Sequence, residues 1–480
     1  MILALDVGTS STRASVFGAD GSLLAGSESR VNYEPQVTPD GGVEHDPARL
    51  LEATAACIDG VLAGGFAVEA VGVCTFWHGL LGFDPSLRPV TPIYTWADTR
   101  SAAAVDDLRA ELDEPAAHAR TGCHFHASYW PAKLRWLSRR SPRLRVHRWG
   151  SIGELLAAEW FGEPATSVSM ASATGLFDQD AARWDPAMLG ASELAESQLF
   201  PLRDRDAPWR VLRAPWAARW PALRRVAWYP AVGDGAASNI GSGCTGPDRI
   251  AINVGTSTAM RLVTPSTGAR PPRGLWRYRV DGRRFVIGGA LSEGGNVYAW
   301  CHDVLRLPGD DEIESILAAT LEREPAATVL PFLAGERSPG WNGRARALIA
   351  GLTLATTPAD ILRAALESVA VRLAMIYAGL GPLAASDHAI VASGGALARS
   401  RTWAQMFADA LGRPLVLSRE TEATSRGVAV LALDALGAVS DLGSPARPVG
   451  DPVTPDPRRR DHYLQVAAEH RRLYAAATGG

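Results

Sequence analysis

One motif occurs twice in this chain, and it constrains the fold more than any other feature. Residues 4–17 read ALDVGTSSTRASVF, and residues 251–263 read AINVGTSTAMRLV. In each copy an apolar run enters a turn of glycine and hydroxyl residues, and a second run follows. This pattern predicts strand, turn and strand. A Rossmann or P-loop unit would pass from its glycine turn into a helix, so neither fold matches.

Similar elements follow both copies of the motif. Residues 46–64 have a proline near their start, apolar spacing near 3.6 and a glycine end, which predicts a helix. The run VEAVGVCTF after it predicts a strand. Further helices are predicted over residues 358–377, 400–412 and 423–437, and a last one through Tyr474. The repeated order predicts two equivalent α/β lobes that face each other across a cleft.

The composition excludes several classes of protein. With 480 residues the chain is too long for one ordinary core, so two or three domains are expected. The hydrophobic fraction of 47% and charged fraction of 21% are typical of soluble globular proteins. A net charge of −3 offers no basic stripe for nucleic acid. Lys133 is the only lysine, which excludes a Walker A loop with its Gly-Lys pair.

The chain carries no recognisable targeting signal. Met1 leads directly into a strand-like run without a basic leader, which predicts no signal peptide. No apolar stretch approaches the roughly 20 residues of a membrane helix. The cysteines are scattered, odd in number and without a CxxC pair: Cys57, Cys74, Cys123, Cys244 and Cys301. We therefore expect reduced thiols, a cytoplasmic location and no membrane partner.

Together with the two turns, three further stretches carry a family resemblance. They are TWADTR at 95–100, VGDGAASNIG at 232–241 and ASGGALARSRTWAQMFADALG at 392–412. With them the chain resembles the FGGY-type carbohydrate kinases over nearly its full length. The resemblance implies an α/β fold of two actin-like (ribonuclease H-like) ATPase lobes. The implied divisions are a sugar-binding lobe at 1–244, a nucleotide-binding lobe at 245–440, and a proline-rich connection with a helix at 441–480.

Within that family, three stretches look most like the gluconate kinases. They are SYWPAKLRWL at 128–137, TSVSMASATGLFD at 166–178 and GERSPGWNGRAR at 335–346. The implied reaction is transfer of the γ-phosphate of ATP to D-gluconate, giving 6-phosphogluconate. A pentulose kinase acting on xylulose or ribulose, or another polyol kinase, is the alternative. A different class is an actin-like nucleotide-binding protein without sugar kinase activity, such as a chaperone-type ATPase.

The two turns are the candidate phosphate sites. Successive backbone N–H groups of a glycine turn form a concavity for anions, and Ser or Thr hydroxyls add donors without charge. Two such turns would hold a triphosphate from both sides, and the resemblance adds Arg13 as a cation. The predicted phosphate-binding residues are Gly8, Thr9, Ser10, Ser11, Arg13, Gly255, Thr256 and Ser257.

Two aspartates are the candidate metal and catalytic groups. In the family an aspartate at the position of Asp6 holds Mg²⁺ through water, and a hard cation prefers a carboxylate with phosphate oxygens. The second copy has Asn253 at this position, so one metal-directed carboxylate is expected. Asp234 is the candidate general base that accepts the proton of the sugar hydroxyl. Its neighbours Gly233 and Gly235 would allow a sugar to approach the backbone closely.

Sugar contacts are expected from the first lobe. Trp77 and His78 follow a strand, and Trp96, Asp98 and Arg100 alternate along an extended segment, so the last three would point the same way. An indole stacks on the C–H faces of a polyol, while the other groups bond to its hydroxyls. Together with Asp234 these form the predicted substrate site.

The nucleotide base is expected near the end of the chain. A turn of small residues allows a base to lie on the backbone, which is the role that the family gives to Gly394, Gly395 and Ala396. Gln405 would reach the base from the next helical turn. The implied cofactors are ATP and Mg²⁺, and the partners are a sugar or sugar acid and ATP. A homodimer is compatible with the sequence, and the roles of Glu336, Arg337 and His126 stay open.

Overall fold

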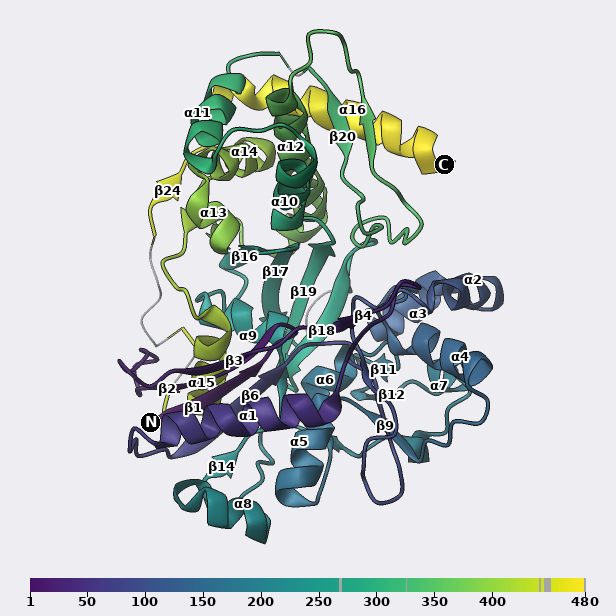
Figure 1. The fold of residues 1–480 in the computed structure, drawn as a ribbon, viewed down its shortest axis with the longest axis vertical. Helices are drawn as coiled ribbons and strands as arrows, with labels where there is room; N and C mark the ends of the chain where they lie inside the picture. Colours follow the sequence, from purple (N-terminus) through teal and green to yellow (C-terminus); the bar gives the residue numbers. More distant parts are fainter. Residues whose placement is uncertain (267–269, 325, 440–441, 444–449, 479–480) are drawn as a thin grey trace.

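The computed structural model of the chain describes residues 1–266, 270–324, 326–439, 442–443 and 450–478. Figure 1 shows two α/β lobes, each built on one copy of the repeated motif, as predicted. Part of the expected proline-rich connection, residues 444–449, lies outside the described residues. Among the helices that are described, none has the length and apolarity needed to cross a membrane.

The N-terminal lobe is built on a six-stranded sheet with the order β14-β6-β1-β2-β3, in which β15 also pairs with β6. β1 (Ile2–Val7) is antiparallel to β2 (Ser11–Phe17) and parallel to β6 (Ala70–Thr75). In this register Asp6 lies between Arg13 and Cys74. The other strands are β3 (Ser29–Asn32), β14 (Ala227–Trp228) and β15 (Val232–Gly233).

Helices cover both faces of this sheet. Leu3 and Leu5 pack against α1 (Pro47–Leu62) and α5 (Ile152–Phe161), while Ile2 and Ala4 pack on the opposite face. Successive side chains of a strand point to opposite faces, so a strand apolar at every position is buried on both. The opposite layer is formed by α9 (Asp234–Gly241) and α15 (Ala423–Ala435).

Additional elements lie between β6 and β14 along the chain. Figure 1 shows α2, α3, α4 and α7 grouped at one side of the N-terminal lobe. The helices of this region are α2 (Ala102–Glu111), α3 (Glu114–Thr121), α4 (Trp130–Arg140), α6 (Val168–Ser172), α7 (Pro186–Ala191) and α8 (Ala214–Arg219). The short strands of this lobe are β4 (Gln36–Val37), β5 (Val43–His45), β7 (Leu81–Phe83), β8 (Ile93–Tyr94), β9 (Arg148–Gly150), β10 (Thr166–Ser167), β11 (Phe177–Asp178), β12 (Arg183–Trp184) and β13 (Leu202–Arg203).

The C-terminal lobe repeats the plan around a seven-stranded sheet with the order β18-β19-β17-β16-β22-β23-β24. Its strands are β16 (Arg249–Val254), β17 (Thr258–Pro265), β18 (Trp276–Asp281), β19 (Arg284–Leu291), β22 (Ala389–Ser393), β23 (Leu415–Leu417) and β24 (Pro452–Val453). A separate pair is β20 (Thr328–Leu330) with β21 (Leu348–Ala350). The helices are α10 (Gly295–Val304), α11 (Asp310–Thr320), α12 (Pro358–Leu380), α13 (Gly395–Arg399), α14 (Arg401–Leu411) and α16 (Arg460–Thr478).

The predicted helix ends agree with local capping. Asp46 caps α1 by accepting a hydrogen bond from the Ala48 N–H at 2.9 Å, and Thr357 forms a capping box with Asp360 at the start of α12. Gly412 ends α14 in the left-handed conformation, with φ 61°. α12 continues three residues beyond the predicted Tyr377, as far as Leu380.

The packing of α15 differs from the lobe in which the sequence places it. Residues 245–440 are assigned to the second lobe, whereas α15 packs on β1 and β6 of the first lobe's sheet. Its Gly427 lies against α9, where an added Cβ would come within 1.8 Å of the Ala237 carbonyl oxygen. This close helix contact couples a late segment of the chain to the helix that begins at Asp234.

Candidate active site

The first hairpin turn joins β1 to β2. The Gly8 N–H donates to the Ser11 carbonyl oxygen at 3.0 Å, and the Tyr33 hydroxyl donates to the Gly8 carbonyl oxygen at 2.7 Å. Ser10 is exposed at the tip and Thr9 is half-buried, whereas Ser11 is 5% exposed. The accessible hydroxyls of this turn are therefore those of Thr9 and Ser10.

The second hairpin turn joins β16 to β17 and is closed by a tighter hydrogen bond, which spans two residues in place of three. The Gly255 N–H donates to the Ser257 carbonyl oxygen at 3.0 Å. The start of α10 supports the turn, because the Gly295 N–H donates to the Gly255 carbonyl oxygen at 2.8 Å. Thr256 is exposed at the tip. Both copies thus present hydroxyl side chains from a turn whose first amide is already bonded.

A pocket of ≈ 360 Å³ joins elements of both lobes beside these turns. Arg13 and Ser238 line it from the first lobe's sheet and α9. Asn253, Ser393, Gly394, Gly395 and residues 417–424 are among the lining groups on the other side. Arg13 pairs there with Glu422, with Nη1 2.9 Å from the carboxylate. The pocket therefore contains residues from both copies of the motif.

The glycine turn after β22 forms one wall of this pocket. Gly394 has φ +110°, and an added Cβ would lie 2.3 Å from the Val254 carbonyl oxygen. A side chain at this position would collide with backbone, so the turn requires glycine. Gly395 lines the pocket, and a Cβ there would meet no atom within 4 Å. Ala396 is half-buried and adjoins Gly295.

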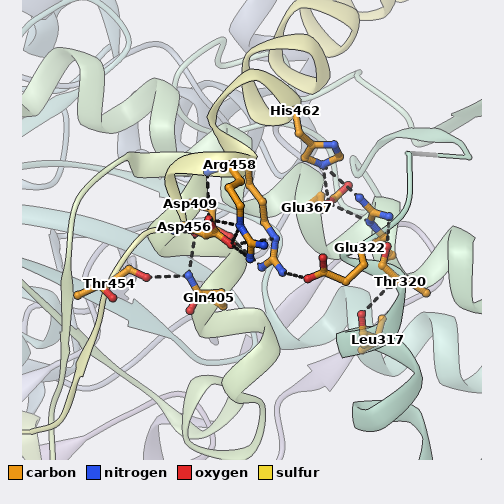
Figure 2. Close-up of polar contacts among 12 residues, drawn as sticks. Leu317, Thr320, Glu322, Glu367, Gln405, Asp409, Thr454, Asp456, Arg458 and His462 are labelled. Atoms are coloured by element: carbon orange, nitrogen blue, oxygen red, sulfur yellow. Dashed lines mark hydrogen bonds and ion pairs between the residues drawn. The ribbon is translucent and has the colours of Figure 1, made fainter.

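Gln405 is not brought to this pocket. Figure 2 shows its amide directed at Asp409 and at the chain near Thr454. Its Nε2 donates to Asp409 at 2.7 Å and to the Thr454 carbonyl oxygen at 2.8 Å. The side chain thus ties α14 to the segment before α16.

Asp6 is enclosed by its strand neighbours. Its Oδ1 accepts a hydrogen bond from the Cys74 thiol at 3.3 Å. Burial raises the pKa of Asp6 from 3.8 to about 6, and the negative charge of Asp234 adds to this rise while Arg13 opposes it. Asp6 therefore lies close enough to Asp234 to be affected by its charge, and two such carboxylates would attract a cation.

The groups around Asp6 match the ligands that Mg²⁺ prefers. No group of three or more His, Cys, Asp or Glu ligands exists within the described ranges, so a cage made wholly of protein is absent there. Mg²⁺ is commonly held by one or two carboxylates together with phosphates and water. Asp6 and Asp234 fit that arrangement, and a nucleotide would supply the remaining oxygens.

Asp234 begins α9, and Trp77 lies directly behind it. The Gly235 N–H donates to Asp234 Oδ1 at 2.8 Å. A Cβ on Gly233 would lie 1.9 Å from the Trp77 ring, and one on Gly235 would lie 2.6 Å from it. The two glycines therefore make room for the indole, which is 5% exposed and donates to the Ser169 carbonyl oxygen. The sequence predicts that these glycines let a sugar approach the backbone, whereas in the structure they accommodate the Trp77 ring.

Arg261 is a site residue that the sequence reasoning missed. It lies on β17 after the second turn, as Arg13 lies on β2 after the first, and this parallel was the available signal. Burial raises the pKa of Asp234, and Arg261 is the largest opposing influence. Burial also lowers the pKa of Arg261 to about 10. The pair keeps a carboxylate of raised proton affinity beside a buried guanidinium.

Arg337 adds a further cation to the site. It is half-buried, and its guanidinium lies over the Trp96 ring, 5.5 Å from the centroid. Its Nε is buried without a hydrogen-bond partner, and the described residues offer its guanidinium no ion pair. Its charge lowers the pKa values of Asp234 and of His78.

His78 is held as a neutral ring close to Arg337. It has φ 67°, and its Nδ1 lies 2.7 Å from the Ala173 carbonyl oxygen. Burial, with Arg337, keeps its pKa well below the usual value. The neutral ring donates from Nδ1, which leaves Nε2 as an acceptor for a hydroxyl. His126 also stays neutral, because burial lowers its pKa to about 3.

Asp98 and Arg100 bond to each other, so their charges are engaged within the protein. Arg100 Nη2 lies 2.5 Å from the Asp98 carboxylate and 2.7 Å from Glu44. Asp98 is 2% exposed, and its Oδ2 accepts from the Val43 N–H at 3.4 Å. The physical reason is charge: two opposite groups two residues apart neutralise one another when a third, Glu44, orients the guanidinium. Of the segment's three predicted residues, Trp96 is the one that meets Arg337.

Comparisons with known proteins show the family of the chain. The family models for the N-terminal and C-terminal domains of the FGGY family of carbohydrate kinases match residues 1–241 and 250–436. A gluconokinase of Bacillus subtilis is 25% identical over 468 residues, covering 94% of this chain and 90% of the relative. A glycerol kinase of Rhodospirillum centenum is 30% identical, covering 92% of this chain and 90% of the relative. The crystal structure of a gluconate kinase from Lactobacillus acidophilus has the same fold, with a TM-score of 0.90 and 24% identity, covering 99% of this chain and 98% of that one.

Proposed function

Because the chain belongs to the FGGY family of carbohydrate kinases and is an ATP-dependent sugar kinase, we propose that its acceptor is a sugar acid. The specific proposal is D-gluconate, which would give 6-phosphogluconate. The gluconokinase relative supports this choice, and the glycerol kinase relative makes a neutral polyol the competing acceptor.

One observation carries the proposal: Arg337 is a half-buried cation that forms no ion pair with any described residue. An unpaired charge removed from water costs free energy, and a substrate carboxylate would recover that cost. A guanidinium also matches a carboxylate through two parallel hydrogen bonds. Trp96 beneath the guanidinium would hold its plane.

Asp234 is proposed as the general base. As the acceptor oxygen forms its bond to the γ-phosphorus, the bond from that phosphorus to the bridging oxygen of ADP breaks. The hydroxyl proton goes to Asp234, whose pKa is raised by burial, so that it accepts a proton more readily than an exposed carboxylate does. Arg261 would oppose the loss of negative charge at this carboxylate until the sugar is in place.

The remaining roles complete the proposed site. Asp6, with Asp234 nearby, would hold Mg²⁺, which neutralises charge on the phosphates when bound. The hydroxyls of Thr9, Ser10 and Thr256 would hold the phosphates from the two lobes. Gly394 and Gly395 would lie beside the adenosine. A cytoplasmic location is proposed as well, which the five free cysteines support.

The test is an ADP-release assay across gluconate, xylulose, ribulose and glycerol. We expect gluconate to be the preferred acceptor. The substitution Arg337→Met should raise the KM for gluconate by about tenfold or more, the value of one charge-assisted contact. Arg344→Met is the matched control, because Arg344 is exposed on the same loop and pairs with Asp106. A neutral sugar that is phosphorylated while gluconate is not would remove the proposal.

A further inference from the structure

The loop that carries Arg337 is organised around one buried carboxylate. The loop, residues 335–342, lies between β20 and β21, and Glu336 within it is 1% exposed. Glu336 Oε1 accepts a hydrogen bond from the Gly340 N–H at 3.1 Å, which closes the loop on itself. Because Glu336 directly precedes Arg337, the contacts that hold this carboxylate also restrain the backbone from which the Arg337 side chain starts.

Two side chains from distant helices bind the same carboxylate. Arg372 of α12 donates to Oε1, and the Tyr474 hydroxyl of α16 donates to Oε2 at 2.5 Å. Arg372 also donates to the Ser338 carbonyl oxygen at 3.0 Å. Both chain neighbours of Arg337 are thus fixed by helices, while its own guanidinium is left without a partner among the described residues.

The sheet and the first lobe hold the rest of the loop. The Ser338 N–H donates to the Ala290 carbonyl oxygen of β19 at 3.0 Å. The Trp341 carbonyl oxygen accepts from Arg109 of α2 at 3.1 Å, and the Trp341 ring stacks on His124 at 5.0 Å. The contact from α16 to Glu336 is made by a neutral hydroxyl, so a single-atom substitution can remove it without removing a charge.

We propose that Tyr474, near the end of the C-terminal helix, is a positioning residue that fixes Arg337 through Glu336 and so sets the affinity for the acid end of the acceptor. This inference rests on the proposed function, because it assigns Arg337 to a substrate carboxylate. A bidentate contact tolerates little displacement, so a loop that shifts by a fraction of an ångström weakens it. Loss of one donor leaves a buried carboxylate under-bonded, and it then moves toward its remaining donors.

The chain offers a matched control on the same helix. Tyr463 of α16 is buried, with 4% of its surface exposed, and its hydroxyl has no partner among the described residues. Tyr463→Phe and Tyr474→Phe therefore each remove one hydroxyl oxygen from α16. Only the second removes a contact with the Arg337 loop.

The experiment measures steady-state kinetics of the full chain with gluconate and ATP varied separately. Tyr474→Phe should raise the KM for gluconate about tenfold, with the KM for ATP and kcat within about twofold, as expected for one charge-assisted hydrogen bond. Tyr463→Phe should match the wild type. In an Arg337→Met background, Tyr474→Phe should add no further change, because the two residues act through one contact.

Each outcome assigns the failure to one proposal. If gluconate turnover depends on Arg337 but Tyr474→Phe behaves like Tyr463→Phe, the positioning role is overturned and the proposed function stands. Equal rises in both KM values with a loss of thermal stability would also overturn it, since that pattern indicates general loosening. If the wild type uses only neutral acceptors, the proposed function fails. The same variants, assayed with that neutral acceptor, then still test the positioning role of Tyr474. The role requires that Tyr474→Phe and Arg337→Met raise the KM for that acceptor by similar factors.

Discussion

In the protein without bound nucleotide or metal, ionisation of Asp6 should lower the free energy of unfolding. Replacing Asp6 by an uncharged residue should therefore stabilise this ligand-free protein. Burial raises the pKa of Asp6 from 3.8 to about 6, so the folded protein binds this proton more tightly than the unfolded chain does. The stabilisation from the bound proton is complete below about pH 4 and is lost as the pH rises through 6. A tenfold difference in proton affinity is worth about 1.4 kcal/mol, so the whole effect is about 3 kcal/mol.

The substitution Asp6→Asn removes the charge and keeps an oxygen that can accept from the Cys74 thiol. At pH 5 the folded wild type still carries the proton in about ten molecules of eleven, so roughly 1.4 kcal/mol of the effect falls between pH 5 and pH 8. The free energy of unfolding of the variant, relative to the wild type, should rise by that amount over this range. Phosphoryl transfer should be lost in the same variant.

The assay is urea unfolding of both proteins at pH 5 and pH 8 without nucleotide or divalent cation, followed by circular dichroism. Glu52→Gln on the exposed surface of α1 is the control, because it removes a carboxylate that the solvent already reaches. A stability difference between Asp6→Asn and wild type that is equal at the two pH values would refute the reasoning. It would mean that Asp6 is not held in a poorly solvated environment.

Three further outcomes are expected. Asp234→Asn should lower kcat by about 10²- to 10⁴-fold and leave ATP binding nearly unchanged. Calorimetric titration with ATP separates the two effects, and a fully active variant would mean that another residue is the base. Gly233→Ala should displace the Trp77 ring, because the new methyl would lie 1.9 Å from it. Tryptophan fluorescence should change and kcat should fall, and an unaltered spectrum would contradict this packing. Gly394→Ala should lower the midpoint of thermal unfolding and raise the KM for ATP. Gly395→Ala is the control: its methyl meets no atom within 4 Å, so the midpoint should stay unchanged. Equal midpoints for the two variants would exclude the backbone collision at Gly394.

Much of the architecture was predictable because its signals are local. The two strand-turn-strand units follow from alternating apolar residues around glycine and hydroxyl turns, and the pairing of β1 with β2 and of β16 with β17 confirms them. The helix ends follow from caps such as Asp46 and Gly412, which act within a few residues. The two-lobed fold then follows from the repeat, since a duplicated order of elements predicts a duplicated domain.

Several predicted residues of the sugar and nucleotide sites depend on partners that the sequence does not reveal. Asp98 and Arg100 bind each other and Glu44, so the alternation that places them on one side does not make both of them free. Gln405 is engaged by Asp409 and the Thr454 carbonyl oxygen. In each case the side chain reaches a partner from another segment of the chain, and local spacing carries no information on that choice.

Local patterns in the sequence are enough to predict where the chain turns, where its helices begin and end, and that two similar halves carry the hydroxyl-rich turns. Which charges are neutralised depends on the folded structure: Arg100 is ion-paired, whereas Arg337 has no ion-pair partner among the described residues. The reason is physical. Backbone conformation is set by sterics and hydrogen bonds over a few neighbouring residues, whereas the state of a buried charge depends on whatever segments the fold brings within a few ångströms of it.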